Sequence, residues 1–118
     1  MTLAPGSDPK LAAADDDSLG ILQFLRDCER LKTVLRTSWT TAGTQESTAS
    51  HSWRLCLAAM LFAPRCPGVD LSRLLQMCVI HDLGEAIGGD VPAIHPSANS
   101  AKAANERRDL VTLMTPLP

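Results

Sequence analysis

The chain has 118 residues, a formal net charge of −2 and four cysteines. This length leaves room for one domain with one hydrophobic core and excludes two. Its 11 Lys and Arg residues are scattered and form no basic stripe, so we do not expect it to bind a nucleic-acid polymer.

The N-terminal stretch carries no targeting or membrane signal. Residues 1–17 lack a positively charged start and a long apolar core, and no part of the chain reaches about 18 uninterrupted apolar residues. We therefore expect a cytoplasmic protein that has no membrane partner. Because the same residues are rich in Pro, Gly, Ala and Asp, we expect a flexible leader over 1–17 and the domain itself over 18–118.

Capping residues and apolar spacing predict four helices. Ser18 and Asp70 are suitable N-caps for the first and the third helix. The second helix is apolar almost all round, which predicts a central helix packed on several sides, with Trp53 in the core. The four helices are expected over residues 19–31, 51–62, 71–82 and about 100–114.

The segment between the first two helices has a different composition. Residues 32–50 are dense in Thr and Ser and contain Gly43, which predicts an irregular loop because such side chains hydrogen-bond to their own backbone. No segment shows the alternation of β-branched and polar residues that is typical of strands. The predicted fold class is therefore all-α.

Four ionisable side chains follow the apolar run 74–80: His81, Asp82, Glu85 and Asp90. Burial of that many titratable groups is costly unless something compensates them. Either this segment reaches the surface at a helix end, or a cation lies there.

A third ligand for such a cation can come from His51, at the start of the second helix. The ends of two packed antiparallel helices can meet with their axes about 8 to 10 Å apart, close enough to share a cation with His81 and Asp82. Two imidazoles and a carboxylate suit Mn²⁺, Co²⁺, Fe²⁺ or Zn²⁺ better than Ca²⁺. Each residue alone also fits an ordinary role, since His51 can be a helix cap and Asp82 a turn residue.

Two further carboxylates can belong to the same pocket. Glu85 lies four residues after His81, so a continuing helical turn puts both on one face, where the carboxylate can orient a water and handle its proton. Asp90 follows a Gly-Gly pair, whose conformational freedom lets the chain turn back. The ordinary alternatives are a solvated Glu85 and a turn-forming Asp90.

Three segments together resemble the HD-domain metal-dependent phosphohydrolases, and most of all their 5′-deoxynucleotidase group. They are ESTASHS at 46–52, the pair His81-Asp82, and EAIGGDVP at 85–92. Upstream, KTVLRTSW at 32–39 is similar to that group's Arg/Trp-bearing loop. The resemblance covers about residues 31–117. It implies an HD-domain helical bundle that hydrolyses deoxyribonucleoside 5′-monophosphates.

The resemblance also implies a role for each site residue. The metal ligands would be His51, His81 and Asp82, and the cofactor a divalent cation such as Mn²⁺ or Co²⁺. Glu85 would position or deprotonate the attacking water. Substrate contacts would be made by Arg36 and Trp39, which hold the phosphate and the nucleotide, and by Asp90, which contacts the sugar. On residue type alone, Arg36 is equally well a surface residue and Trp39 a core residue.

The chain departs from the family pattern in one respect. The family supplies a further Asp ligand from a later helix, and Glu106 and Asp109, the only acidic residues after Asp90, look like ordinary charged-face groups. The ending at 113–118 resembles an interior point of the family fold, so we expect a truncated product, a fragment or an inactive derivative, with reduced or absent activity. Missing helices would expose the apolar faces of 51–62 and 71–80, which a homodimer would cover.

Two other functions remain open from the sequence. One is a non-catalytic helical module that binds a nucleotide or a partner helix without turnover. The other is an HD phosphohydrolase that acts on a signalling nucleotide, with the same metal site and a different pocket.

Overall fold

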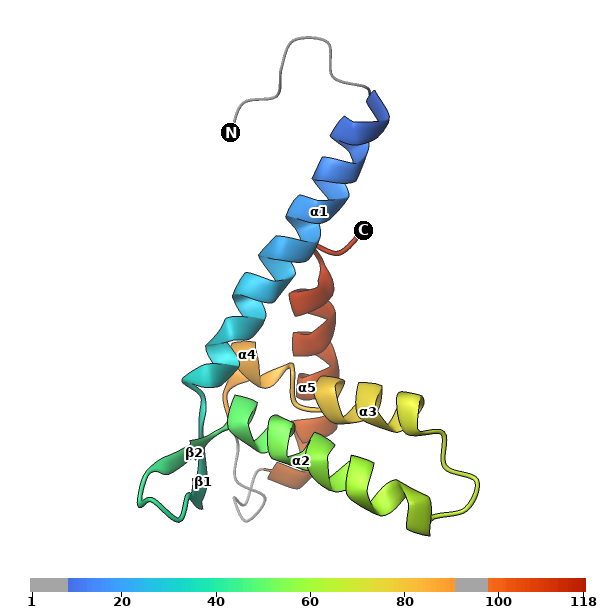
Figure 1. The fold of residues 1–118 in the computed structure, drawn as a ribbon. Coiled ribbons are helices and arrows are strands. Elements are labelled where there is room, and N and C mark those ends of the chain that lie inside the picture. Colours follow the sequence, from blue (N-terminus) through green and yellow to red (C-terminus); the bar gives the residue numbers. More distant parts are fainter. Residues whose placement is uncertain (1–8, 91–97) are drawn as a thin grey trace.

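The computed structural model of the chain describes residues 9–90 and 98–118 (Figure 1). Helices dominate this part of the chain, which confirms the predicted all-α class. The elements are α1 (Pro9–Cys28), the 3-10 helix η1 (Glu29–Lys32), β1 (Leu35–Trp39), β2 (Gln45–Ser47), α2 (Thr48–Phe62), the 3-10 helix η2 (Ala63–Arg65), α3 (Leu71–Ile80), α4 (Glu85–Gly88) and α5 (Ala98–Met114).

The first helix begins earlier than expected. Helix α1 starts at Pro9, so Ser18 lies inside the helix instead of capping it, and residues 9–17 are helical although we expected them in a leader. The physical reason is local: proline suits the first position of a helix, and the alanines that follow have the highest helix propensity. Residues 1–8 of the expected leader lie outside the described residues.

The expected loop over 32–50 contains a β-hairpin, so that prediction was wrong. Strands β1 and β2 are antiparallel, with Leu35 opposite Ser47 and Trp39 opposite Gln45. In the turn, Thr40 N donates to Thr44 O (2.7 Å) and Gly43 N donates to Thr40 O (3.0 Å). Gly43 has a φ of +86°, which a residue with a side chain rarely adopts. The Thr and Gly residues that we read as loop-forming thus close a hairpin turn.

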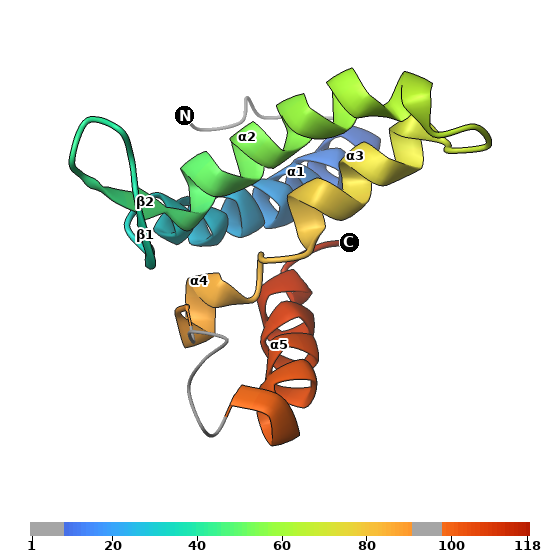
Figure 2. The same ribbon diagram turned by 90° about the horizontal axis from the view of Figure 1, so that it is seen from below.

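Helices α2 and α3 form an antiparallel pair that lies across the other helices (Figures 1 and 2). Ser47 caps α2, because its side chain accepts a hydrogen bond from Ser50 N (3.2 Å). Asp70 caps α3 in the same way through Arg73 N (3.2 Å), which confirms the predicted cap. The antiparallel arrangement brings the start of α2 and the end of α3 to the same end of the pair.

The buried core is small and lies where η1, α4 and α5 meet. It consists of Leu31, Ala86 and Leu113, with Phe24, Cys28, Ala49 and Leu83 packed against it. Helices α4 and α5 approach closely at Gly84, where a Cβ would lie 2.9 Å from the backbone oxygen of Glu106. This contact fixes the short helix α4, and with it Glu85, against the core.

Helix α2 is not packed on several sides, and the prediction of Trp53 as a core residue was wrong. Trp53 is 65% exposed and Leu61 74% exposed, and on α3 Met77 is 60% exposed. The reason is that α3 covers only one side of α2. The expected exposure of the apolar faces of 51–62 and 71–80 is therefore observed, whereas association into a homodimer stays a prediction. None of the described helices combines the length and the hydrophobicity needed to cross a membrane.

Candidate active site

The three residues predicted as metal ligands lie together. His51 comes from the first turn of α2, His81 from the residue that ends α3, and Asp82 from the next position. One ligand atom from each lies within 4.8 Å of the others. Asp82 Oδ2 is 2.9 Å from Nε2 of His81 and 3.9 Å from Nε2 of His51. The antiparallel pairing of α2 and α3 thus joins residues that are 30 positions apart in the sequence.

The geometry of these side chains fits a divalent transition-metal ion. Metal bonds of about 2.0–2.2 Å separate neighbouring ligand atoms by about 3 to 4 Å, which matches the distances to Asp82 Oδ2. Nδ1 of His81 donates a hydrogen bond to the carbonyl of Cys78 (2.8 Å), which leaves Nε2 with its lone pair facing Asp82. A histidine that binds a metal usually has its other ring nitrogen held by a carbonyl or carboxylate in this way.

Glu46 is a member of the site to which we assigned no role from the sequence. Its Oε1 lies 3.8 Å from Nδ1 of His51 and 3.6 Å from Nε of Arg36. The strand pairing produces this arrangement, because Arg36 on β1 lies beside Glu46 on β2. Burial lowers the pKa of His51, and the positive charge of Arg36 lowers it further. Arg36 therefore lies at the edge of the site and is not simply a surface residue.

Glu85 is buried, in contrast to the solvated alternative. It is the first residue of α4, its exposed fraction is 9%, and its Oε2 accepts a hydrogen bond from the Thr48 hydroxyl (2.8 Å). Burial raises the pKa of Glu85 to about 7, although the hydrogen bond from Thr48 and the charge of Arg36 act in the opposite direction. A carboxyl group with this pKa can both accept and release a proton near neutral pH.

The two remaining substrate-contact residues differ in their placement. Asp90 is half-buried and follows Gly89, whose φ of +72° turns the chain. Its charge raises the pKa of Glu85, so it lies near that carboxyl group. Trp39 is 68% exposed, which rules out the core alternative. It lies three residues beyond Arg36 along β1, a distance of about 10 Å at the rise of a strand. Within residues 9–90 and 98–118, no hydrogen bond or ion pair links Trp39 to the site.

In the described part of the chain, the acidic residues of α5 lie outside the cluster of His51, His81 and Asp82. Glu106 pairs with Lys102 (3.8 Å) and Asp109 with Arg108 (3.8 Å). Asp109 is nevertheless not an ordinary charged-face residue, because its side chain is only 16% exposed and lies against Gly88. Its carboxylate therefore belongs to the contact between α4 and α5.

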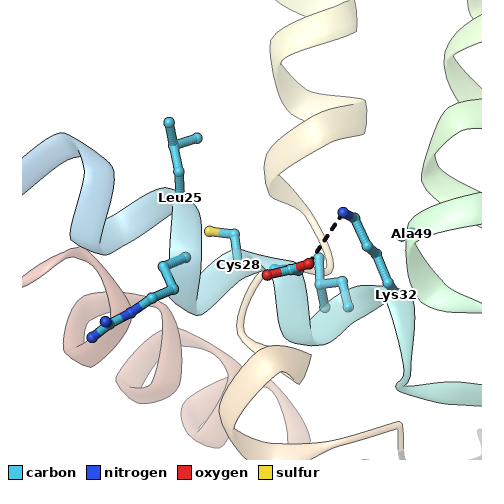
Figure 3. A pocket seen from close by; sticks show the side chains of 7 residues that line it. Leu25, Cys28, Lys32 and Ala49 are labelled. Atoms are coloured by element: carbon cyan, nitrogen blue, oxygen red, sulfur yellow. Dashed lines mark hydrogen bonds and ion pairs between the residues drawn. The ribbon is translucent and has the colours of Figure 1, made fainter.

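A surface hollow lies elsewhere, beside α1 and η1 (Figure 3). It is lined by Leu25, Arg26, Cys28, Glu29, Leu31, Lys32 and Ala49, none of which belongs to the ligand cluster. Lys32 and Glu29 pair with each other at its edge (3.4 Å). The hollow therefore offers no chemistry that competes with the cluster of His51, His81 and Asp82.

Comparison with known proteins agrees with this geometry. The model of the HD domain family matches residues 28–118. The chain belongs to the HD-domain family. It is 36% identical over 94 residues to the 5′-deoxynucleotidase hdd1 of Schizosaccharomyces pombe, a match that covers 78% of this chain and 45% of the relative. It is 33% identical over 91 residues to the human 5′-deoxynucleotidase HDDC2, covering 75% of this chain and 42% of the relative.

A solved structure shares the fold of this HD domain. The crystal structure of a predicted metal-dependent phosphohydrolase from Magnetospirillum magnetotacticum MS-1 matches with a TM-score of 0.78 and 28% identity. The match covers 89% of this chain and 53% of that chain. The predicted family resemblance is thus confirmed, and the chain spans about half the length of the relatives that it matches.

Proposed function

We propose that the chain is a metal-dependent phosphomonoesterase that hydrolyses deoxyribonucleoside 5′-monophosphates to the deoxynucleoside and phosphate. The observation that carries this proposal is the convergence of His51, His81 and Asp82, with one ligand atom of each within 4.8 Å of the others. The donor set is typical of a site for Mn²⁺, Co²⁺ or a similar ion.

The residues around the ligands supply the rest of the chemistry. When bound, a divalent cation lowers the pKa of a water and polarises a phosphoryl oxygen. Glu85 takes the proton of the attacking water, for which its pKa of about 7 is suited. Arg36 offsets negative charge on the phosphate and can do so by exchanging its partner Glu46 for the phosphate group. The bond between phosphorus and the 5′-oxygen then breaks, and the nucleoside oxygen receives a proton.

The choice of substrate rests on the relatives and on two further residues. Several relatives are named 5′-deoxynucleotidases, which supports a nucleoside monophosphate as the substrate. We propose that Asp90 contacts the sugar, because it lies near Glu85 at the end of α4. Trp39 is exposed at the end of β1, where it can stack on a base that extends from the site.

We also expect the hydrolysis to be slow in this chain. The described cluster offers three protein ligands, and a site with fewer anionic ligands holds its cation more weakly. The alternative function is a module that binds a nucleotide or a partner helix without turnover, and it is favoured by the exposed apolar faces of α2 and α3. It predicts that the chain binds no metal tightly.

Phosphate release tests the hydrolase. The wild-type chain should release phosphate from deoxynucleoside monophosphates with Mn²⁺ or Co²⁺, and His81→Ala should abolish the release. Gln76→Ala, on the exposed side of α3, is the matched control and should leave the rate unchanged. Equal rates for wild type and His81→Ala would remove the hydrolase proposal.

Calorimetric titration with Mn²⁺ tests the metal site without relying on turnover. We expect saturable binding to the wild-type chain and its loss in His51→Ala. The absence of both metal binding and phosphate release would favour the non-catalytic module.

A further inference from the structure

We propose that Thr48 is a positioning residue of the site: its hydroxyl group holds the carboxyl group of Glu85 in the orientation needed for proton transfer. The inference rests on the proposed function of Glu85 as the group that exchanges the proton. It assigns to Thr48 a role through Glu85 and no contact with the substrate.

The contact between the two side chains is buried and short. Thr48 is 0% exposed and Glu85 9% exposed. The Thr48 hydroxyl donates to Oε2 of Glu85 at 2.8 Å, across 37 positions of sequence. Oε1 of Glu85 makes no hydrogen bond to any residue in the described ranges, so it is the oxygen left for proton exchange. Fixing one carboxyl oxygen determines where the other one points.

Thr48 is itself held in place on both sides. Its backbone N–H donates to the carbonyl of Val34 (2.8 Å), immediately before β1, and the preceding Ser47 caps α2. A β-branched side chain in a helix also has few allowed rotamers. Thr48 lies three residues before His51, so both project from the same side of the first turn of α2. The hydrogen bond therefore ties α4 to the helical turn that carries a predicted metal ligand.

A hydroxyl group suits this position better than any other small side chain. It can donate to Oε2 both when Glu85 is ionised and when Oε1 carries the proton, so the contact survives a change of protonation. The other charged groups near Glu85 are Asp82 and Asp90, which raise its pKa, and Arg36, which lowers it. In the described part of the chain, none of these three makes a hydrogen bond to the carboxyl group of Glu85, so Thr48 is the residue that orients it.

Two variants of Thr48 separate the effect of its hydroxyl group from the effect of its side-chain shape. Thr48→Val keeps the shape and removes the donor, whereas Thr48→Ser keeps the donor and removes a methyl group. We expect Thr48→Val to lower kcat about tenfold or more without a comparable change in KM, and Thr48→Ser to stay within about threefold of wild type. A purely structural role predicts the reverse order, because Ser leaves a cavity that Val does not.

A second measurement does not depend on turnover. The protonation of Glu85 is followed by NMR with ¹³C-labelled glutamate in the full chain without added divalent metal, and Glu85→Gln identifies the signal. Thr48→Val should raise the measured pKa of Glu85 by about one or more, and Thr48→Ser should leave it close to wild type. Equal pKa values in wild type and Thr48→Val would overturn the inference. A wild-type chain without phosphatase activity would refute the proposed function, while this titration would still decide the role of Thr48.

Discussion

The buried carboxyl group of Glu85 makes a testable prediction about stability and pH. Burial raises the pKa of Glu85 from 4.5 to about 7. Between these two values the folded chain keeps a proton on Glu85 that the unfolded chain has lost. The free energy of unfolding should therefore decrease as pH rises through this window. At about 1.4 kcal/mol per pKa unit, the decrease is at most about 3.5 kcal/mol.

The variant Glu85→Gln isolates this contribution. Glutamine resembles the protonated carboxyl group and can still accept the hydrogen bond from Thr48. Its stability should equal that of wild type near pH 4, below the unfolded-state pKa, and exceed it by up to about 3 kcal/mol near pH 8. Since a domain of this size is stable by about 5 to 15 kcal/mol, urea denaturation in the presence of a chelator can resolve the difference.

The comparison of wild type with Glu85→Gln also removes the contribution of His51 to the pH dependence of stability. Burial lowers the pKa of His51, which makes stability increase with pH just below 6.5, opposite to the effect of Glu85. Because both proteins contain His51, its contribution cancels in the difference between them. A constant difference in stability between about pH 5 and pH 8 would refute the reasoning, and so would a wild type more stable than Glu85→Gln at the higher pH.

The packing of α4 and the cap of α3 give two further predictions. Gly84→Ala should destabilise the fold by about 1 to 2 kcal/mol in urea denaturation, because its Cβ would meet the Glu106 backbone oxygen at 2.9 Å. Gly88→Ala should cost clearly less, because its Cβ would meet only the movable end of the Asp109 side chain. Equal losses of stability in the two variants would contradict this reasoning. Asp70→Ala should cost about 1 kcal/mol through the lost cap of α3, and Asp70→Asn only a few tenths; a neutral Asp70→Ala would show that the cap contributes nothing.

The helices could be predicted from the sequence because their signals are local. Asp70 before an apolar run marks the start of α3, and the prolines and glycine after Phe62 mark the end of α2. The β-hairpin could not be predicted in the same way. Its strands have only five and three residues, and their pairing depends on the turn at Gly43 as well as on their own composition. The missed signal was the run from Leu35 to Trp39, where β-branched and aromatic residues favour a strand.

The arrangement of the candidate site could be predicted only in part, for a related reason. His51, His81 and Asp82 stand in a recognisable series, and the packing of α2 on α3 brings them together as expected. The contacts of Glu46 and Thr48 depend instead on tertiary structure. Thr48 meets Glu85 only because α4 folds against the first turn of α2. The exposure of Trp53 has the same origin, since burial depends on which element covers a helix and not on the residue alone.

The pKa shifts of Glu85 and His51 have a common cause and opposite directions. Burial is the largest contribution to both, and it raises the pKa of the carboxyl group to about 7 while lowering that of the imidazole from 6.5. Near neutral pH, His51 is therefore mostly neutral, as a metal ligand must be, and Glu85 is poised to gain or lose a proton. The burial of each group thus sets it in the protonation state that the proposed hydrolysis requires, and at Glu85 this burial costs stability.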